Sequence, residues 1–455
     1  MKFSTSFLFI NLLFQIISYG QTKNDSIELI LDFPVLDIGY QSLAAKTTDG
    51  ILSSYINPSM KQSLTASNNL YSTAHWGIKR MFRNQSEFKR ILFSNSVAMA
   101  FDLLISRAPL SSVWLHEEYH RAVLTRREVN SFNDINSFPY GDRTVAVRKI
   151  DDSDLIFISD NHATDFRRLM SAGNEAGNHQ IQSLQKNNFY YNQDLPHIPL
   201  YWISTMTNIF NVANSTSSSF DELVDEANAE EGSDIERRDF TGPDFTAWAD
   251  ALFFPEKPYE ERGIHPSGVG INRYIKPSSL NEETQNYLNR QGFLQLLNVL
   301  SPHLFGFSKI KLFSNSKGDY FGNFAVRHIL TPFGNDLNVD IFYQTPTENL
   351  FFAVHIYNNL NNTFGGVEAG IIDKQLFNDK LLISARSMIW LQPNDLSFFE
   401  SQSSLGGLLS AKTSYSFGKI KPYLQVDAKS DGWVMGNVFL NENISLNMGL
   451  NIWIN

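Results

Sequence analysis

The stretch ISLNMGLNIWIN, residues 444–455, decides the fold class that this sequence indicates. Apolar and polar side chains alternate along it, so that one face of an extended chain would be apolar and the other polar. A period of two is the pattern of a β-strand with one buried face, because successive side chains of a strand point to opposite sides. The apolar row consists of Ile444, Leu446, Met448, Leu450, Ile452 and Ile454.

The same alternation recurs upstream as far as about Leu304. It is clearest in residues 337–344, 350–357, 381–389 and 420–428, and turn-forming residues separate these runs, as at 331–336 and 430–432. We therefore expect residues 304–455 to form an antiparallel β-meander of roughly ten strands, each about ten residues long. This region resembles outer-membrane β-barrels in strand length, alternation and short turns. A soluble antiparallel sheet would show the same alternation and is the alternative.

Residues 21–303 predict a mainly helical domain. One early strand is expected near residues 27–33, and the pattern is helical from about Asn57 to Arg107. The most apolar helix of that segment, Ile91 to Ile105, contains Asp102, which could accept a hydrogen bond from a metal-bound histidine. The predicted fold class is thus α+β: a helical domain over 21–303 and a β-meander, closed as a β-barrel, over 304–455.

Residues 1–20 have the features of a secretory signal peptide. Lys2 precedes an apolar run from Phe7 to Ile17, and small residues at Ser18 and Gly20 offer a cleavage site. A retained N-terminal anchor is the alternative. The chain has no cysteine, which suits a bacterial envelope better than a eukaryotic secreted protein. Its net charge of −10 makes nucleic acid an unexpected partner. We predict an exported protein of the cell envelope, located in the outer membrane and in contact with its lipid.

The stretch WLHEEYHRAVL, residues 114–124, carries the chemistry. Pro109 and Ser111 offer helix start signals, and no Pro or Gly follows until past Val129. On a helix, His116 and His120 lie four residues apart on one face, where two imidazoles can hold one Zn²⁺. Glu117 would lie beside the open coordination position and act as general base on zinc-bound water.

A third protein ligand is expected from LMSAGNEAGNH, residues 169–179. Its small residues, 172, 173, 176 and 177, form two rows that would let two helices approach closely. Glu175 lies between these rows and is the predicted third ligand, with His179 as its rival. The alternative is that this segment is a close helix crossing, or a loop, and supplies no ligand.

The His-Glu-x-x-His stretch resembles the zincin metallopeptidases, and a downstream Glu175 would resemble the gluzincin arrangement. The resemblance covers the motif helix and one further helix. Two positions depart from it, because Glu118 and Arg121 are charged where zincins usually carry uncharged residues. The longer metzincin pattern is absent, since Val123 and Arg126 stand at its Gly and third His positions.

Two functions follow from these features. The first is an envelope zinc metallohydrolase, foremost a peptidase acting on a protein or peptide, with His116, His120 and Glu175 on zinc and Glu117 as general base. A lipid or peptidoglycan linkage is a further possible substrate of the same chemistry. The second is a structural or transport outer-membrane β-barrel protein in which the His-Glu-x-x-His stretch is accidental.

Overall fold

The computed structural model describes residues 27–37, 57–137, 145–191, 193–377 and 380–454. The predicted signal peptide, residues 1–20, lies outside these described residues. Within them, no helix combines the length and the apolar character that crossing a membrane requires.

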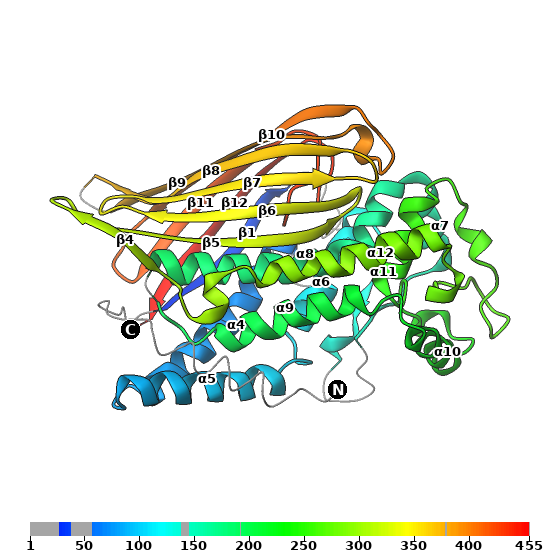
Figure 1. The fold of residues 1–455 in the computed structure, drawn as a ribbon, viewed down its shortest axis with the longest axis horizontal. Helices are drawn as coiled ribbons and strands as arrows, with labels where there is room; N and C mark the ends of the chain where they lie inside the picture. Colours follow the sequence, from blue (N-terminus) through cyan, green and yellow to red (C-terminus); the bar gives the residue numbers. More distant parts are fainter. Residues whose placement is uncertain (1–26, 38–56, 138–144, 192, 378–379, 455) are drawn as a thin grey trace.

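Helices dominate the chain up to about residue 305, as the sequence predicted, and they lie together on one side of the sheet, where we refer to them as the helical layer (Figure 1). A two-stranded ladder lies beside them, formed by β2 (Phe132–Asn133) and β3 (Val147–Arg148). The α-helices are α4 (Met60–Met81), α5 (Glu87–Leu104), α6 (Ser112–Arg126), α7 (Asp152–Asn161), α8 (Ala163–Tyr191), α9 (Ile198–Ala213), α10 (Ser219–Glu231), α11 (Asp244–Phe253) and α12 (Glu282–Leu294).

The last third of the chain is an antiparallel meander, which confirms the predicted α+β fold class. Each strand pairs with the next one along the chain. The strands are β4 (Ile310–Asn315), β5 (Gly318–Thr331), β6 (Gly334–Gln344), β7 (Asn349–Asn358), β8 (Thr363–Leu376), β9 (Leu381–Pro393), β10 (Ser403–Tyr415), β11 (Ile420–Lys429) and β12 (Asn443–Ile454).

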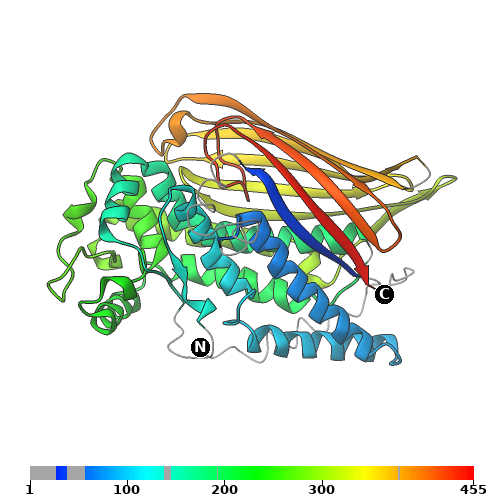
Figure 2. The same cartoon turned by 180° about the vertical axis from the view of Figure 1, so that it is seen from behind.

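The predicted early strand is present as β1 (Ile27–Asp37) and completes a ten-stranded sheet. It pairs antiparallel with β12, so that Leu29 lies opposite Ile452, and the two strands run side by side in Figure 2. Strands β1 and β4 are the two edges and do not pair with each other, so the sheet is open. The pairing of the described strands therefore does not show the predicted closure into a barrel.

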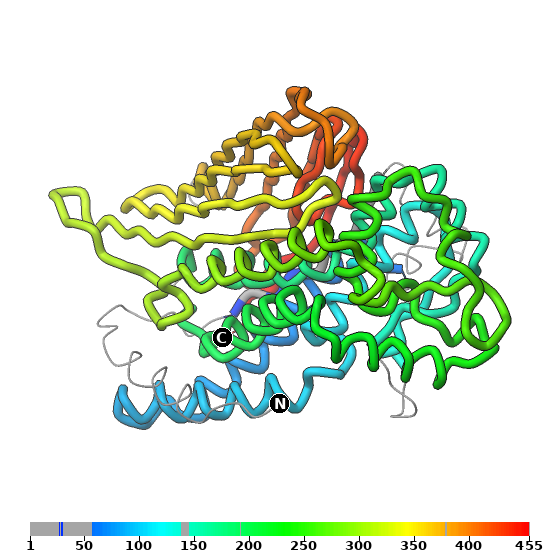
Figure 3. Tube along the Cα trace, turned by 45° about the vertical axis from the view of Figure 1, so that its right-hand side comes forward, coloured from blue at the N-terminus to red at the C-terminus, as the bar shows by residue number. Residues whose placement is uncertain are grey.

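Helix α8 is the element that joins the two layers, and most of its 29 residues are buried. Its C-terminal half packs on the sheet, where Phe189 and Tyr190 meet Phe342 and Phe351. Polar contacts accompany the apolar ones: Gln182 donates to Asp340 on β6 at 3.0 Å. Figure 3 shows the sheet lying over the helical layer. The N-terminal half of α8 packs on α6, which carries the His-Glu-x-x-His stretch.

Candidate metal centre

Helix α6 places the two motif histidines as the sequence predicted, on one face of a helix. Ser111 caps its start by accepting a hydrogen bond from the Trp114 amide at 3.1 Å. The helix then runs to Arg126 without interruption, and the ring centroids of His116 and His120 lie 4.8 Å apart. The two imidazoles are thus neighbours on the same side of α6.

Asp244, the first residue of α11, faces these imidazoles. The turn before it depends on Gly242, whose φ of +64° favours glycine and whose added Cβ would lie 2.7 Å from the Tyr274 ring. Pro243 then caps the helix from an extended conformation. An acidic side chain in the first turn is also favoured by the helix dipole. The local sequence therefore fixes both the start of α11 and the position of Asp244.

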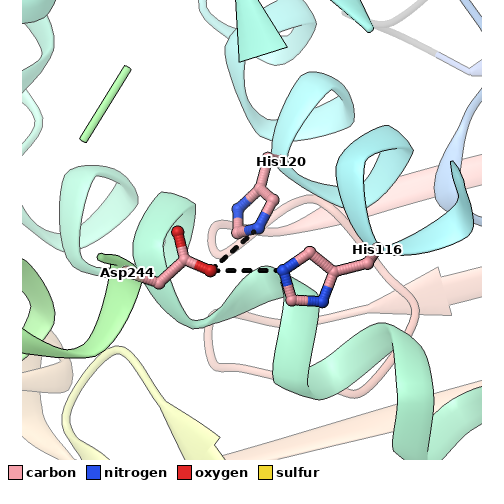
Figure 4. Close-up of side chains that lie close together, drawn as sticks. All are labelled: His116, His120 and Asp244. Carbon is pink, nitrogen blue, oxygen red and sulfur yellow. Dashed lines mark hydrogen bonds and ion pairs between the residues drawn. The ribbon is translucent and has the colours of Figure 1, made fainter. Parts of the chain in front are cut away.

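The three side chains converge on one point (Figure 4). Oδ2 of Asp244 lies 3.2 Å from Nε2 of His116 and 3.4 Å from Nε2 of His120. Among the described residues, these three are the one group of metal-ligating side chains whose ligand atoms all lie within 4.8 Å of one another. The His120 side chain is buried, whereas those of His116 and Asp244 are about a fifth and a seventh exposed. The group can therefore hold a metal ion that is reached from one side.

The hydrogen bonding of His120 favours a cation at this point. Its Nδ1 lies 2.5 Å from the carbonyl oxygen of Leu169, which can only accept, so Nδ1 carries a proton. In the neutral ring Nε2 then has a lone pair that faces the Asp244 carboxylate, and two acceptors repel. Nε2 is buried and has no hydrogen-bond partner in the described structure. A proton or a metal ion between these atoms removes the repulsion.

Charge around the group is negative. Burial and the nearby charge of Asp244 together raise the pKa of Asp239 to about 7. Burial also raises the pKa of Glu117 well above its usual value; His116 opposes this effect, while Asp239 and Asp244 reinforce it. Burial would raise the pKa of Asp244 as well, but His120 and His116 lower it below its usual value. A bound cation would balance this surplus of carboxylates.

Glu117 is buried, at 4% exposure. Its pKa responds to His116, Asp239 and Asp244, so it lies near the metal-ligating group. The neighbouring Glu118 has a different role. It holds Arg121 through two hydrogen bonds of 2.9 and 2.8 Å and also accepts from Asn133. The two charged positions that depart from the zincin pattern therefore pair with each other inside the fold.

Glu175, the predicted third ligand, is not brought to the histidines. Its carboxylate accepts from Arg168 at 2.9 Å, from the Gly436 amide at 2.7 Å and from Trp433 Nε1 at 3.3 Å. The residue is fully buried there. These contacts tie α8 to the segment between β11 and β12. Asp244 lies where Glu175 was expected.

The rival candidates also lie elsewhere. His179 contacts the hydroxyl of Tyr119 through Nδ1 at 2.9 Å. Asp102, considered as a hydrogen-bond acceptor for a ligand histidine, instead lies 2.8 Å from Nε2 of His75. The ring of His75 in turn contacts His197, so this buried group is separate from the metal-ligating one.

The small residues of α8 have a structural use that the sequence indicated as the alternative, a close helix crossing. A Cβ added at Gly173 would lie 2.1 Å from Cε1 of His116, so the imidazole occupies the space that glycine leaves. A Cβ at Gly177 would lie 2.7 Å from the Asn208 amide of α9. Helix α8 thus contributes room for His116 and the Leu169 carbonyl for His120.

Comparison of this chain with protein-family models, with curated proteins and with solved structures finds no match. Function is therefore inferred from the site itself.

Proposed function

We propose that the protein is a zinc-dependent hydrolase of the cell envelope, with peptide bonds as its first substrate class. The observation that supports this most strongly is the convergence of two imidazole nitrogens and one carboxylate oxygen. Ligand atoms about 2.0–2.1 Å from a tetrahedral Zn²⁺ lie roughly 3.3 Å from one another. The distances from Asp244 Oδ2, 3.2 and 3.4 Å, match that spacing.

The donor set favours zinc over harder cations. Mg²⁺ and Ca²⁺ prefer six or more oxygen ligands, whereas two imidazoles and one carboxylate are a usual zinc combination. Three protein ligands also leave a fourth position for water or substrate, as in catalytic zinc sites. The partial exposure of His116 and Asp244 gives that position an approach from solvent.

Zinc bound here would supply Lewis acidity and lower the pKa of a coordinated water. Glu117 is the residue to move the proton. As a carboxylate it accepts a proton from the attacking water, and as the acid it donates that proton to the leaving amine nitrogen, which regenerates the carboxylate. The Leu169 carbonyl keeps the proton of His120 on Nδ1 and so leaves Nε2 for the metal.

Peptide bonds are the first candidate substrate because a Glu directly after the first of two histidines four apart is the arrangement of zinc peptidases. The third ligand is an Asp from α11 and not the Glu from α8 that a gluzincin would use. The proposal therefore extends to the reaction class, metal-assisted hydrolysis, and not to membership of that group.

Metal content tests the site. Purified full-length protein should hold about one zinc per chain. Asp244→Asn should lose it, because an amide is a much poorer zinc ligand than a carboxylate. Asp250→Asn, a buried acid of the same helix, is the matched control and should retain zinc. A wild-type protein that stays metal-free in zinc-containing buffer would contradict the proposal and favour a non-enzymatic envelope protein.

Activity tests the reaction. Glu117→Gln should bind zinc normally but cleave a fluorogenic peptide library at a rate at least 100-fold below wild type, because it cannot accept the proton. If no peptide is cleaved by the zinc-loaded protein, ester-linked lipids and peptidoglycan fragments are the next substrates to screen with the same variant. Equal rates for Glu117→Gln and wild type would remove Glu117 from the mechanism.

A further inference from the structure

The two faces of the sheet differ in polarity, and the apolar face is the one that points away from the helices. One row of register partners across seven strands faces the helices: Asp340, Ala353, Glu368, Met388, Leu408, Lys429 and Asn443. Every residue of this row is buried. The adjacent row, displaced by one residue, faces away from α8. We call the face made by such positions the outward face.

The outward face is apolar and exposed. Its large side chains include Phe352, Val354, Val367, Ile389, Leu409 and Ile444, which are between 40% and 65% exposed. In the described parts of β6–β12, the outward positions carry one charged residue, Lys374. That lysine lies near the end of β8 and pairs with Glu348 in the adjoining turn. Water is a poor solvent for an apolar surface spread over so many strands.

The other charged side chains of β6–β12 lie on the opposite, helix-facing side, where several of them form ion pairs. Arg386 donates to Glu368 through two hydrogen bonds of 2.8 and 2.7 Å. Arg327 donates to Asp340 at 2.7 Å. A soluble half-exposed sheet places polar residues outside and apolar residues inside. The outer side of this sheet is apolar instead, which is the arrangement of strands whose outer surface meets hydrocarbon.

The helical layer pairs some of the backbone groups along the β1 edge and along β5, beyond the end of β4. At the β1 edge, the side chain of Asn69 on α4 accepts from the Ile30 amide at 3.1 Å and donates to the Ile30 carbonyl at 2.6 Å. Pro34 is an even number of residues from Ile30, so its backbone nitrogen points to the same edge of β1. Because proline has no N–H, this position leaves no donor to be paired. An apolar solvent penalises unpaired backbone groups at an edge, and at Ile30 both groups are paired.

At the other edge, β4 covers only the first part of β5. Beyond it, four alternate amides of β5 donate to groups outside the ladder. Phe324 donates to the Asn323 side chain at 2.9 Å, Val326 to the Leu300 carbonyl at 3.0 Å, His328 to the Asn298 side chain at 2.6 Å and Leu330 to the Asn174 side chain at 3.0 Å.

We propose that the outward face contacts the hydrocarbon of a lipid bilayer as an open sheet, whose edges are sealed by helices and not by each other. The occupant is lipid because the face is almost uncharged over many strands, because the charges are gathered on its reverse side, and because helices pair backbone groups at Ile30 of β1 and along β5. The helical layer, with the metal-ligating group, lies on the other side of the sheet. The proposal does not depend on the hydrolase activity.

The absence of cysteine from the chain permits a direct test. Single cysteines replace Ile389 or Leu409 on the outward face, or Leu223 on α10, which is 51% exposed and serves as the control. Each full-length variant carries an environment-sensitive fluorophore and is reconstituted into phosphatidylcholine vesicles. We expect a blue shift and a brighter emission at 389 and 409, and no change at 223.

A second measurement uses vesicle flotation. Ile389→Lys should lower the partitioning of folded protein into the same vesicles by about 30-fold or more, the ratio expected for a lysine that faces the bilayer interior. Leu223→Lys should leave it unchanged. Circular dichroism confirms that both variants are folded, since both positions are exposed.

Two results would overturn the proposal. One is a fluorophore at 389 and 409 that still reports water in the presence of vesicles. The other is a lipid-free dimer, seen by sedimentation equilibrium, that shields the same two positions, because a second copy of the chain would then cover the outward face.

Discussion

The residues of this site differ in how far the sequence alone could predict their roles. The His116–His120 pair was predictable because its spacing is local and helical. Asp244 was not, because it lies 128 residues after His116 and no fixed spacing links α6 to α11. An acid after a Gly-Pro turn was its one signal, and a chain with 47 acidic residues offers many competitors.

Gly173 was noticed for its small size, and the close helix approach that it was expected to allow is present, but the sequence did not identify His116 as the side chain that fills the space. Gly173→Ala should lower zinc affinity by at least 10-fold, because the new methyl group would displace the His116 ring. Competition with a chromogenic chelator measures this. The control is Gly77→Ala in helix α4, where nothing lies within 4 Å of the added Cβ. Unchanged zinc affinity in Gly173→Ala would show that His116 does not need its present position.

If zinc binds as proposed, proton competition at His120 should set the pH dependence of its binding. Burial alone would lower the pKa of His120, but the charge of the nearby Asp244 carboxylate and the hydrogen bond to the Leu169 carbonyl raise it above its usual value. The zinc-free ring is therefore protonated below that raised pKa and must lose its proton when zinc binds. Zinc affinity should fall as pH falls through this pKa and level off above it.

Calorimetry in buffers with different ionisation enthalpies measures the released proton. We expect more proton release per zinc at about pH 6 than at about pH 8. An affinity that is independent of pH over this range, with no proton release, would argue against His120 as a ligand.

At the scale of elements, the strands were predictable and their closure was not. Alternation is a local property, so the meander could be inferred from residues 337–344 or 444–455 alone. Whether the two edges meet depends on side chains from distant helices, Asn69, Asn174 and Asn298, which no periodic pattern marks. The crossing of α6 and α8 was predictable in part. The small residues of α8 indicated a close helix contact, but they did not show which residue packs against each of them.

The edge caps should contribute to stability. Asn298→Ala removes the acceptor of the His328 amide and leaves a buried N–H unpaired, which should lower the free energy of unfolding by about 1–3 kcal/mol. Urea denaturation measures the change. Asn84→Ala, at an exposed turn, should change it by less than about 0.5 kcal/mol. Equal effects of the two substitutions would mean that the β5 edge is not sealed by this contact.

For the whole molecule, the site links segments that are remote in sequence. Helix α6 and helix α11 meet only in the folded chain, so zinc should bind the folded state and not the unfolded one. At a free zinc concentration 100 times the dissociation constant, zinc should add about 2.7 kcal/mol to the free energy of unfolding. Thermal unfolding with zinc and with a chelator measures this difference. Asp244→Asn should show a much smaller one.

X-ray absorption at the zinc edge of the purified full-length protein tests the central claim most directly. The predicted spectrum is that of about four nitrogen or oxygen neighbours at about 2.0–2.1 Å, with the multiple scattering of two imidazoles. Asp244→Asn should lose or alter it, and Asp250→Asn should not. A spectrum without two imidazoles, or one unchanged in Asp244→Asn, would contradict a metal ion shared by His116, His120 and Asp244.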